Sequence, residues 1–463
     1  MFKIFIILIS ILTITTQLTA CSSDESPFKT PNTGTSGGGG GANPGGGAGG
    51  GGSSTGPTPF DNVSLFSAFS NSFLGMSNIT KLMISDNGGV IAIVSTHDFT
   101  GNNPDGVNQV FIINGASVRQ ITEFTTAAGG IPDPEMFSLS GDGSLLAFFS
   151  TYDSTLGTNI DNSSELYTID TSTSTITQVT NDGASHNAGV NTSAVTGCPV
   201  NCISLNTDGS VLVFSSPLDY TTGNAGGVLQ IFSITTAGGI TTQITSATTN
   251  HTLDEIQFSG DSSRITFIGG SDWSEVGTNA DGNNEVYTIN FSGLSLIQIT
   301  NTALSVSQNN LNPRISNDGD TIIFGSEYDV LASNAATNKI FSYNVTSGLT
   351  TEVDTGSSFV VGSALNDRWD ISGDGTQVSY EASDCNSGTQ RYEMIQTSVD
   401  TISTTLDELY VRDIITLVTI ACVHDTRYVK SNLNGSNVYF LSNIEFLLTT
   451  ATQSTVQIYS VSR

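Results

Sequence analysis

The amino-acid sequence predicts an all-β protein, a β-propeller of seven four-stranded blades closed by an N-terminal strand. The clearest repeat spans residues 136–180, where four short apolar runs are separated by turn residues. Asp142-Gly143 lies between the first two runs, and this dipeptide predicts a tight primed hairpin turn because it accepts positive φ. A four-stranded sheet has two faces and cannot bury both alone, so each repeat needs neighbours.

The same unit recurs seven times along the chain. The copies of its first hairpin begin at Ile84, Leu139, Leu205, Phe258, Ile315, Ile371 and Ser431. The third strand is predicted to begin at Gln109, Glu165, Gln230, Glu285, Lys339, Glu408 and Gln457. The fourth strand is recognised at Arg119, Thr177, Thr242, Ile297 and Thr351. Seven sheets in series, each covered on both faces, fit a closed ring of blades.

Three elements of the repeat resemble the TolB-like and WD-repeat-like β-propeller repeats of bacterial envelope proteins. They are the Ser-x-Asp-Gly turn, the strand that begins Glu/Gln-aliphatic-Tyr/Phe, and the closing Gln-Ile/Val-Thr. The resemblance covers residues 79–463 and implies the fold, whereas such repeats serve many unrelated functions. The additional N-terminal α/β domain of TolB has no counterpart, because a Gly-rich segment takes its place.

Closure of the ring is predicted from the two ends of the repeat region. The seventh repeat has no fourth strand after Gln457. Residues 63–69 are apolar, alternating and otherwise unassigned. We expect them to supply the outer strand of the last blade, because an open ring would expose sheet edges that promote aggregation.

The N-terminal region predicts export and a lipid anchor. Residues 1–20 read as a signal peptide, with one Lys and an apolar run too short to span a membrane. Leu18-Thr19-Ala20-Cys21 resembles a bacterial lipobox, which implies a diacylglyceryl (palmitate-bearing) Cys21; the alternative is an ordinary signal with an incidental cysteine. The Ser residues after Cys21 favour the outer membrane by analogy with enterobacterial sorting.

Residues 21–59 are predicted to form the lipidated end and a flexible tether, and residues 60–463 the propeller. Positions 34–56 hold fourteen Gly, so this stretch cannot form a core. Taking residues 22–59 as the tether, 38 residues of Gly-rich chain have an r.m.s. reach of roughly 35 Å. The propeller is therefore expected to stand off the membrane surface as a monomer.

Strand order also predicts which loops share a face. In a four-stranded meander the first and third turns lie on one face, here called the tight-turn face. The longer polar loops lie on the opposite face, here called the loop face: 96–108, 152–164, 181–203, 217–228, 271–284, 327–338 and 383–406. Binding groups usually occupy loops on a rigid scaffold, so the loop face is the candidate functional surface.

An Asn-x-Asp pattern recurs in three of these loops. Asparagine, aspartate and glutamate oxygens are ligands that Ca²⁺ accepts. The candidate calcium ligands are Asn103, Asp105, Asn159, Asp161, Glu165, Asn279, Asp281, Asn283 and Glu285. The alternative, which the sequence favours, is that these side chains bend the loops through bonds to the backbone.

The cysteines predict disulfides. Four remain after Cys21, an even number in an exported chain. The expected pairs are Cys198 with Cys202 and Cys385 with Cys422. A metal site at Cys198 and Cys202 is the alternative.

Charge and histidine placement bear on function. The formal net charge of −29 repels phosphate backbones and excludes a nucleic-acid role. The four histidines lie in different repeats without a pairing motif. The sequence thus favours a lipid-anchored cell-envelope scaffold that binds envelope proteins without catalysis. A calcium-dependent or glycan-binding surface module is the second hypothesis, and a propeller-fold hydrolase or lyase the third.

Overall fold

The computed structural model describes most of the repeat region. The described residues are 63–67, 79–114, 117–125, 136–151, 159, 163–181, 202–248, 252–270, 273, 279–303, 310–328, 330–331, 339–353, 369–384, 389–398, 407–415, 426–444 and 453–462. Within these ranges there is no α-helix, and hence none long and apolar enough to cross a membrane. The predicted signal peptide, Cys21 and the tether lie outside the described residues.

The strands form seven antiparallel sheets of four, numbered here as blades 1 to 7 in chain order. Blade 1 consists of β2 (Ile79–Ile84), β3 (Ile91–Ser95), β4 (Gln109–Asn114) and β5 (Ser117–Gln120). Blade 2 consists of β6 (Phe137–Leu139), β7 (Leu145–Ser150), β8 (Glu165–Asp170) and β9 (Ile176–Gln178). Blade 3 consists of β10 (Ile203–Leu205), β11 (Val211–Ser216), β12 (Gln230–Thr235) and β13 (Thr242–Gln243). Blades 4 and 5 are β14 (Thr252–Phe258), β15 (Arg264–Gly270), β16 (Asn284–Asn290) and β17 (Leu296–Gln298); and β18 (Asn310–Ile315), β19 (Thr321–Ser326), β20 (Lys339–Asn344) and β21 (Leu349–Glu352). Blade 6 is β22 (Trp369–Ile371), β23 (Gln377–Asp384), β24 (Thr389–Ser398) and β25 (Asp407–Ile415), and blade 7 is β26 (Thr426–Ser431), β27 (Asn437–Ile444), β28 (Gln453–Ser462) and β1 (Val63–Ser67).

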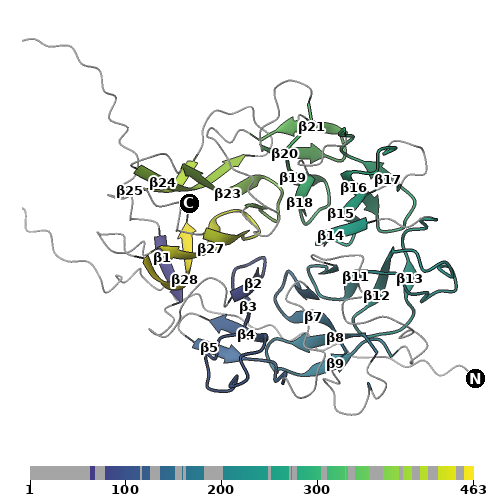
Figure 1. Cartoon of the computed structure of the whole chain (residues 1–463), viewed down its shortest axis with the longest axis horizontal. Coiled ribbons are helices and arrows are strands. Elements are labelled where there is room, and N and C mark those ends of the chain that lie inside the picture. Colours follow the sequence, from purple (N-terminus) through teal and green to yellow (C-terminus); the bar gives the residue numbers. More distant parts are fainter. Residues whose placement is uncertain are drawn as a thin grey trace, which may run out of the picture. The chain divides into compact units, whose positions relative to one another are not determined.

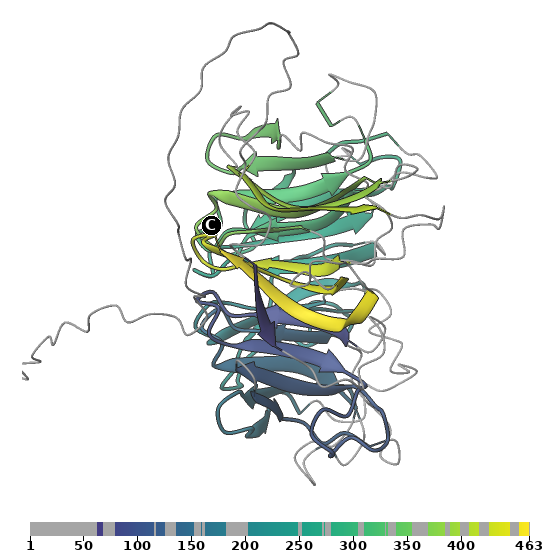
Figure 2. The same ribbon diagram turned by 90° about the vertical axis from the view of Figure 1, so that its left-hand side faces the viewer.

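Blade 7 confirms the predicted closure. Its outer strand is β1, which pairs antiparallel with β28, Val63 opposite Val461 and Leu65 opposite Tyr459. Figure 2 shows β1, drawn in purple, beside the yellow β28. The first and last described strands therefore share one sheet, and β28 has a hydrogen-bonded neighbour on each side.

Hydrogen bonds between neighbouring turns join the blades into a ring. At each junction, an amide in the turn after one first strand donates to a carbonyl in the equivalent turn of the next blade. The bonds run from Asp86 N to Gly141 O (2.6 Å), Asp142 N to Thr207 O (2.7 Å), Thr207 N to Gly260 O (3.1 Å), Asp261 N to Asn317 O (2.8 Å), Asn317 N to Gly373 O (2.7 Å), Asp374 N to Leu433 O (2.7 Å) and Leu433 N to Asp86 O (2.6 Å). The last bond returns to blade 1, so the ring closes, and Figure 1 shows the sheets around a common centre.

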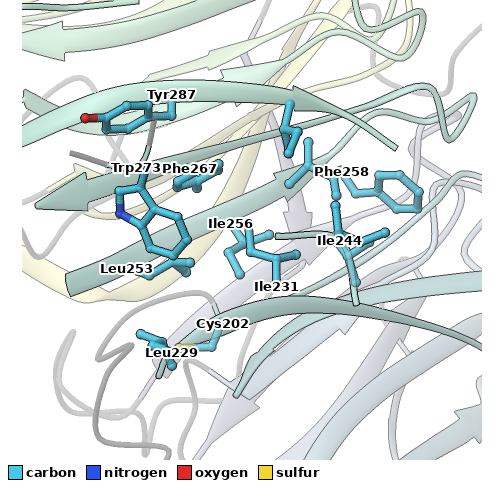
Figure 3. Packing of buried hydrophobic residues seen from close by; sticks show 13 residues of the cluster. Cys202, Leu229, Ile231, Ile244, Leu253, Ile256, Phe258, Phe267, Trp273 and Tyr287 are labelled. Carbon is cyan, nitrogen blue, oxygen red and sulfur yellow. The ribbon is translucent and has the colours of Figure 1, made fainter. Parts of the chain in front are cut away.

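The apolar residues of the repeat pack between neighbouring blades. Figure 3 shows one such layer, in which Ile231 of blade 3 faces Leu253 and Ile256 of blade 4. The Tyr or Phe of the third-strand motif has a further role, because it stacks on a Phe of the second strand directly opposite. The stacked pairs are Phe148 with Tyr167, Phe214 with Phe232, Phe267 with Tyr287 and Phe324 with Phe341, with centroids 5.4–5.7 Å apart.

The hairpin turn differs from the predicted primed form. Gly143 has φ +76°, but Asp142 is not in the left-handed region, and Gly143 N donates to Ser140 O at 2.9 Å. The turn is thus an ordinary turn followed by a left-handed glycine. Asp142 Oδ1 accepts bonds from Ser140 Oγ (2.7 Å) and Ser144 N (2.8 Å). Burial opposes ionisation, but these bonds outweigh it and lower the pKa of Asp142.

Blade 6 also departs from the prediction. Its third strand is β24 (Thr389–Ser398), within the stretch 383–406 that was predicted as a loop, and Glu408 belongs to the fourth strand. The motif match at Glu408 misled the assignment, because Glu-Leu-Tyr also begins a strand in other blades. Only residues 385–388 separate β23 from β24, so blade 6 lacks the long second-to-third connection of blade 1.

Candidate functional site

The Glu or Gln that begins the third-strand motif clamps the fourth strand. In blades 1 to 4 its side-chain oxygen accepts a bond from a Thr hydroxyl of the closing Gln-Ile/Val-Thr: Gln109 from Thr122, Glu165 from Thr180, Gln230 from Thr245 and Glu285 from Thr300. The same Thr oxygen accepts from the amide of the residue after the Glu or Gln, at 2.8–2.9 Å. Both halves of the recognised motif are therefore structural, and blade 5 replaces this clamp with the ion pair Lys339–Glu352.

The asparagines of the Asn-x-Asp loops hold the loop backbone. Asn103 Nδ2 donates to Thr96 O (3.1 Å) and Val107 O (2.9 Å). Asn159 and Asn279 make the equivalent bond to the carbonyls of Ser163 and Asn283, both at 2.8 Å. All three asparagines are buried. The loop-bending interpretation of the pattern is borne out by these contacts.

The described candidate calcium ligands do not converge. Glu165 and Glu285 are fully buried in their clamps, where Glu285 accepts from Thr302 N (2.6 Å) and Asn310 Nδ2 (3.1 Å). Asp105 and Asp281 are exposed, and Asp161 lies outside the described residues. Within the described ranges, no group of three or more His, Cys, Asp and Glu is placed to hold a metal ion. Calcium binding therefore stays a prediction.

The cysteines and histidines lie mostly outside the described residues. Cys202 is buried and disulfide-bonded, and its partner is not among the described residues. Cys198, Cys385 and Cys422 are likewise outside the described ranges, so the predicted pairing is untested. His97 packs edge-on against Phe99, with ring centroids 4.7 Å apart. The other three histidines are outside the description.

The first strands of the seven blades surround a central cavity of about 200 Å³. Its floor lies at the tight-turn face, where Asp86 reaches across the ring. Asp86 Oδ2 accepts bonds from Asn317 Nδ2 (2.7 Å) and Thr207 Oγ1 (3.2 Å). A Cβ on Gly260 would lie 2.3 Å from Thr207 Oγ1, and one on Gly141 2.5 Å from Asp86 Oδ2. Glycines alternate with larger residues round the floor, because the side chains of Asp86 and Thr207 already fill the space that a Cβ would need.

The cavity wall is built mainly from one position of the repeat, the residue before each hairpin start. From blade 1 to blade 7 this wall position holds Met83, Ser138, Ser204, Gln257, Arg314, Asp370 and Lys430. Three of these side chains accept a bond from an amide of the next blade: Ser138 Oγ from Leu205 N (3.1 Å), Ser204 Oγ from Phe258 N (3.0 Å) and Asp370 Oδ2 from Ser431 N (2.9 Å). The wall position thus braces neighbouring blades.

Charge is unevenly distributed round this wall. Arg314 and Lys430 line it from blades 5 and 7, and Lys81 adds a third cation from blade 1. Arg314 Nε lies 3.8 Å from Asp370 Oδ1, and Arg314 Nη1 donates to Pro313 O at 3.0 Å. Lys81 and Arg314 are only 7% and 4% exposed. Sequence reasoning missed this site because it searched the loops, although charges at one register of an apolar strand were a readable signal.

Comparison with known proteins found no matching family model and no matching curated protein. Among solved structures, the chain is similar to an oligogalacturonate lyase in complex with manganese, at 12% identity over 83% of this chain and 89% of that chain, with a TM-score of 0.47. It is also similar to TolB from Acinetobacter baumannii, at 14% identity over 75% of this chain and 63% of that chain, with a TM-score of 0.37. The β-propeller domain of the Trilobed protease from Pyrococcus furiosus shares 12% identity over 84% of this chain and 94% of that chain, with a TM-score of 0.47. These likenesses concern the fold.

Proposed function

We propose that the chain is a lipid-anchored cell-envelope scaffold whose seven-bladed ring binds a partner protein at the loop face. The observation that carries this proposal is the direction of β1. Val63 pairs with Val461 near the tight-turn end of β28, and Ser67 pairs with Ile458 farther along. The chain therefore enters the ring at the tight-turn face. The second-to-third loops 96–108 and 217–228 lie at the other ends of the strands, so the first described strand does not begin at the loop face.

The internal hydrogen bonds support a rigid frame for such a surface. The clamps join third and fourth strands, and the turn-to-turn bonds join every blade to the next. Binding groups on a rigid frame need little ordering when a partner docks, which favours affinity. The loops of the loop face expose small and polar residues such as Asp105, Ala225 and Ala280.

Site-specific photo-crosslinking in intact cells tests the assignment of faces. A photoreactive residue at Ala225 or Ala280 reports on the loop face. The matched control positions are Ile240 and Leu294, which lie in third-to-fourth turns of the tight-turn face and are 92% and 86% exposed. We expect one discrete protein adduct from the loop-face positions and none from the controls.

Calcium and EDTA arms separate the scaffold from the calcium-dependent alternative. Adducts in both conditions support the scaffold, whereas adducts only with calcium favour the calcium-dependent module. Adducts of equal yield from both faces, or from neither, contradict the proposed docking face. The captured protein is then purified and mixed with the chain that carries the photoreactive residue in place of Ala225. Crosslinking that saturates as the partner concentration rises would show specific binding.

A further inference from the structure

We propose that the central cavity is a binding site for a small multivalent oxyanion, held by Lys81, Arg314 and Lys430. This inference is independent of the scaffold role. The charged residues that line the cavity are these three cations and the carboxylates Asp86 and Asp370, a net charge of +1. The whole chain carries −29, with thirteen Lys and Arg in total. A positive cavity inside so acidic a protein is opposite in sign to its surroundings.

Other blades of the same protein show that the wall position does not need a cation for the blade to form. Blades 2, 3 and 4 carry Ser138, Ser204 and Gln257 at the wall position, and the two serines brace the next blade with neutral hydrogen bonds. Burying a cation is unfavourable unless it is compensated. Arg314 is compensated by Asp370, whose Oδ1 lies 3.8 Å from its Nε, and Lys430 is only half-buried. A charge at this register is nevertheless not required to build a blade, since blades 2 to 4 form with neutral side chains there.

The cations share one part of the ring. Lys430 and Lys81 come from the adjacent blades 7 and 1, which Leu433 N joins through Asp86 O, and Arg314 comes from blade 5, beyond blade 6. Asp370 of blade 6 stands among them, but its Oδ2 accepts from Ser431 N at 2.9 Å and serves the brace. Blades 5, 6, 7 and 1 thus contribute three cations and two carboxylates to the wall, while blades 2 to 4 contribute serine and glutamine side chains. That arrangement suits an oxyanion that accepts charge-assisted bonds on one side and neutral bonds on the other.

The volume of the cavity and its closed end limit the kinds of ligand that can bind. The cavity volume of about 200 Å³ has room for several water molecules. It admits phosphate or a small di- or tricarboxylate rather than a folded partner. The floor at Asp86, Thr207 and Asn317 closes the tight-turn end. The ligand would enter from the loop face, and a planar guanidinium can donate to two oxygens of one carboxylate or phosphate group.

Calorimetric titration of the purified full-length protein tests the site, with inorganic phosphate and citrate as separate probes. We expect one anion per chain, and the tighter probe distinguishes a phosphate from a carboxylate ligand. Lys81→Met and Lys430→Met should each weaken binding about tenfold, the loss of one charge-assisted hydrogen bond. Lys339→Met, which removes an outer-rim cation, is the matched control and should leave affinity unchanged.

A crystallographic measurement on the wild-type protein tests the site even if a cavity variant fails to fold. Crystals of the wild-type protein are soaked in selenate, and anomalous density is expected between Lys81, Arg314 and Lys430. The proposal is overturned if neither probe binds and the cavity shows no selenium peak. It is also overturned if Lys339→Met weakens binding as much as Lys81→Met does.

Discussion

Blades 2 to 4 and blades 5 to 7 build the same sheets with different chemistry. The first set, the neutral arc, has Ser138, Ser204 and Gln257 at the wall position and fastens its outer strands with Thr hydroxyls. The second set, the charged arc, has Arg314, Asp370 and Lys430 at the wall, and blade 5 fastens its outer strand with Lys339–Glu352. The neutral arc shows what the fold requires. The charged arc adds Arg314, Asp370 and Lys430 at the same position.

The largest expected effect lies in the neutral arc, at the clamp of blade 4. Glu285→Ala should lower the free energy of unfolding by about 3 kcal/mol, because Thr300, Thr302 and Asn310 lose a shared buried acceptor. Denaturant unfolding at neutral pH measures it. Glu285→Gln is the control, with an expected loss below about 1 kcal/mol, since burial raises the pKa of Glu285 and blades 1 and 3 use glutamine here. Equal losses from both variants would contradict the clamp.

The floor of the cavity joins the two arcs, and it should resist enlargement. Gly260→Ala places a methyl group 2.3 Å from Thr207 Oγ1 and 2.8 Å from Asn317 Cγ. The expected destabilisation is about 2 kcal/mol by chemical denaturation. Gly226→Ala is the control, because its nearest neighbour would be Val228 Cγ2 at 3.7 Å. A Gly260 variant as stable as the control would show that the floor is not filled.

Neutralising Asp254, in the first strand of blade 4, should stabilise the protein. Burial raises the pKa of its carboxyl to about 6. The folded protein holds this proton more tightly than the unfolded chain does, so the stabilisation is present below the unfolded pKa of 3.8 and is lost as the pH rises through 6. Asp254→Asn should therefore add about 2 kcal/mol above pH 6, after discounting for partial exposure, and nothing near pH 3. Denaturation at both pH values measures this, and a gain that does not depend on pH would contradict the assignment.

The ion-pair clamp of blade 5 should contribute less than the hydroxyl clamp of the neutral arc. Lys339→Met should cost at most about 1 kcal/mol, because both charged side chains are partly exposed. Thr245→Val in blade 3 should cost about 2 kcal/mol, since Gln230 Oε1 loses a buried donor and Ile231 N loses its acceptor. Paired urea titrations compare them. A larger loss from Lys339→Met would reverse the ranking of the two arcs.

The smallest expected effect concerns calcium and the Asn-x-Asp loops. The melting temperature should be the same in millimolar calcium and in EDTA, because Asn103, Asn279 and Glu285 are engaged in hydrogen bonds within the protein. Asp105→Ala and Asp281→Ala should be equally silent, since both carboxylates are exposed. Differential scanning calorimetry checks this. A calcium-dependent shift that Asp281→Ala abolishes would restore the metal interpretation.

Much of the fold was readable because it is periodic. Turn residues and apolar alternation recur in every blade, and an error in one copy is corrected by the others. The third strand of blade 6 was missed because β24 begins only five residues after β23 ends, so the motif at Glu408 fell one strand late. The turn conformation was missed because Asp-Gly permits a primed turn, whereas the surrounding bonds of Ser140 and Asp142 select another.

The sequence by itself determined the number of blades and the closing role of the segment before the first repeat, since both follow from local pattern and chain order. The cavity was decided only by the tertiary structure. Lys81, Arg314 and Lys430 stand up to 349 positions apart, and nothing in a local pattern brings them together. Ring closure does so, because seven first strands must share one centre, and Arg314 and Lys430 at the wall position then line one cavity with Lys81.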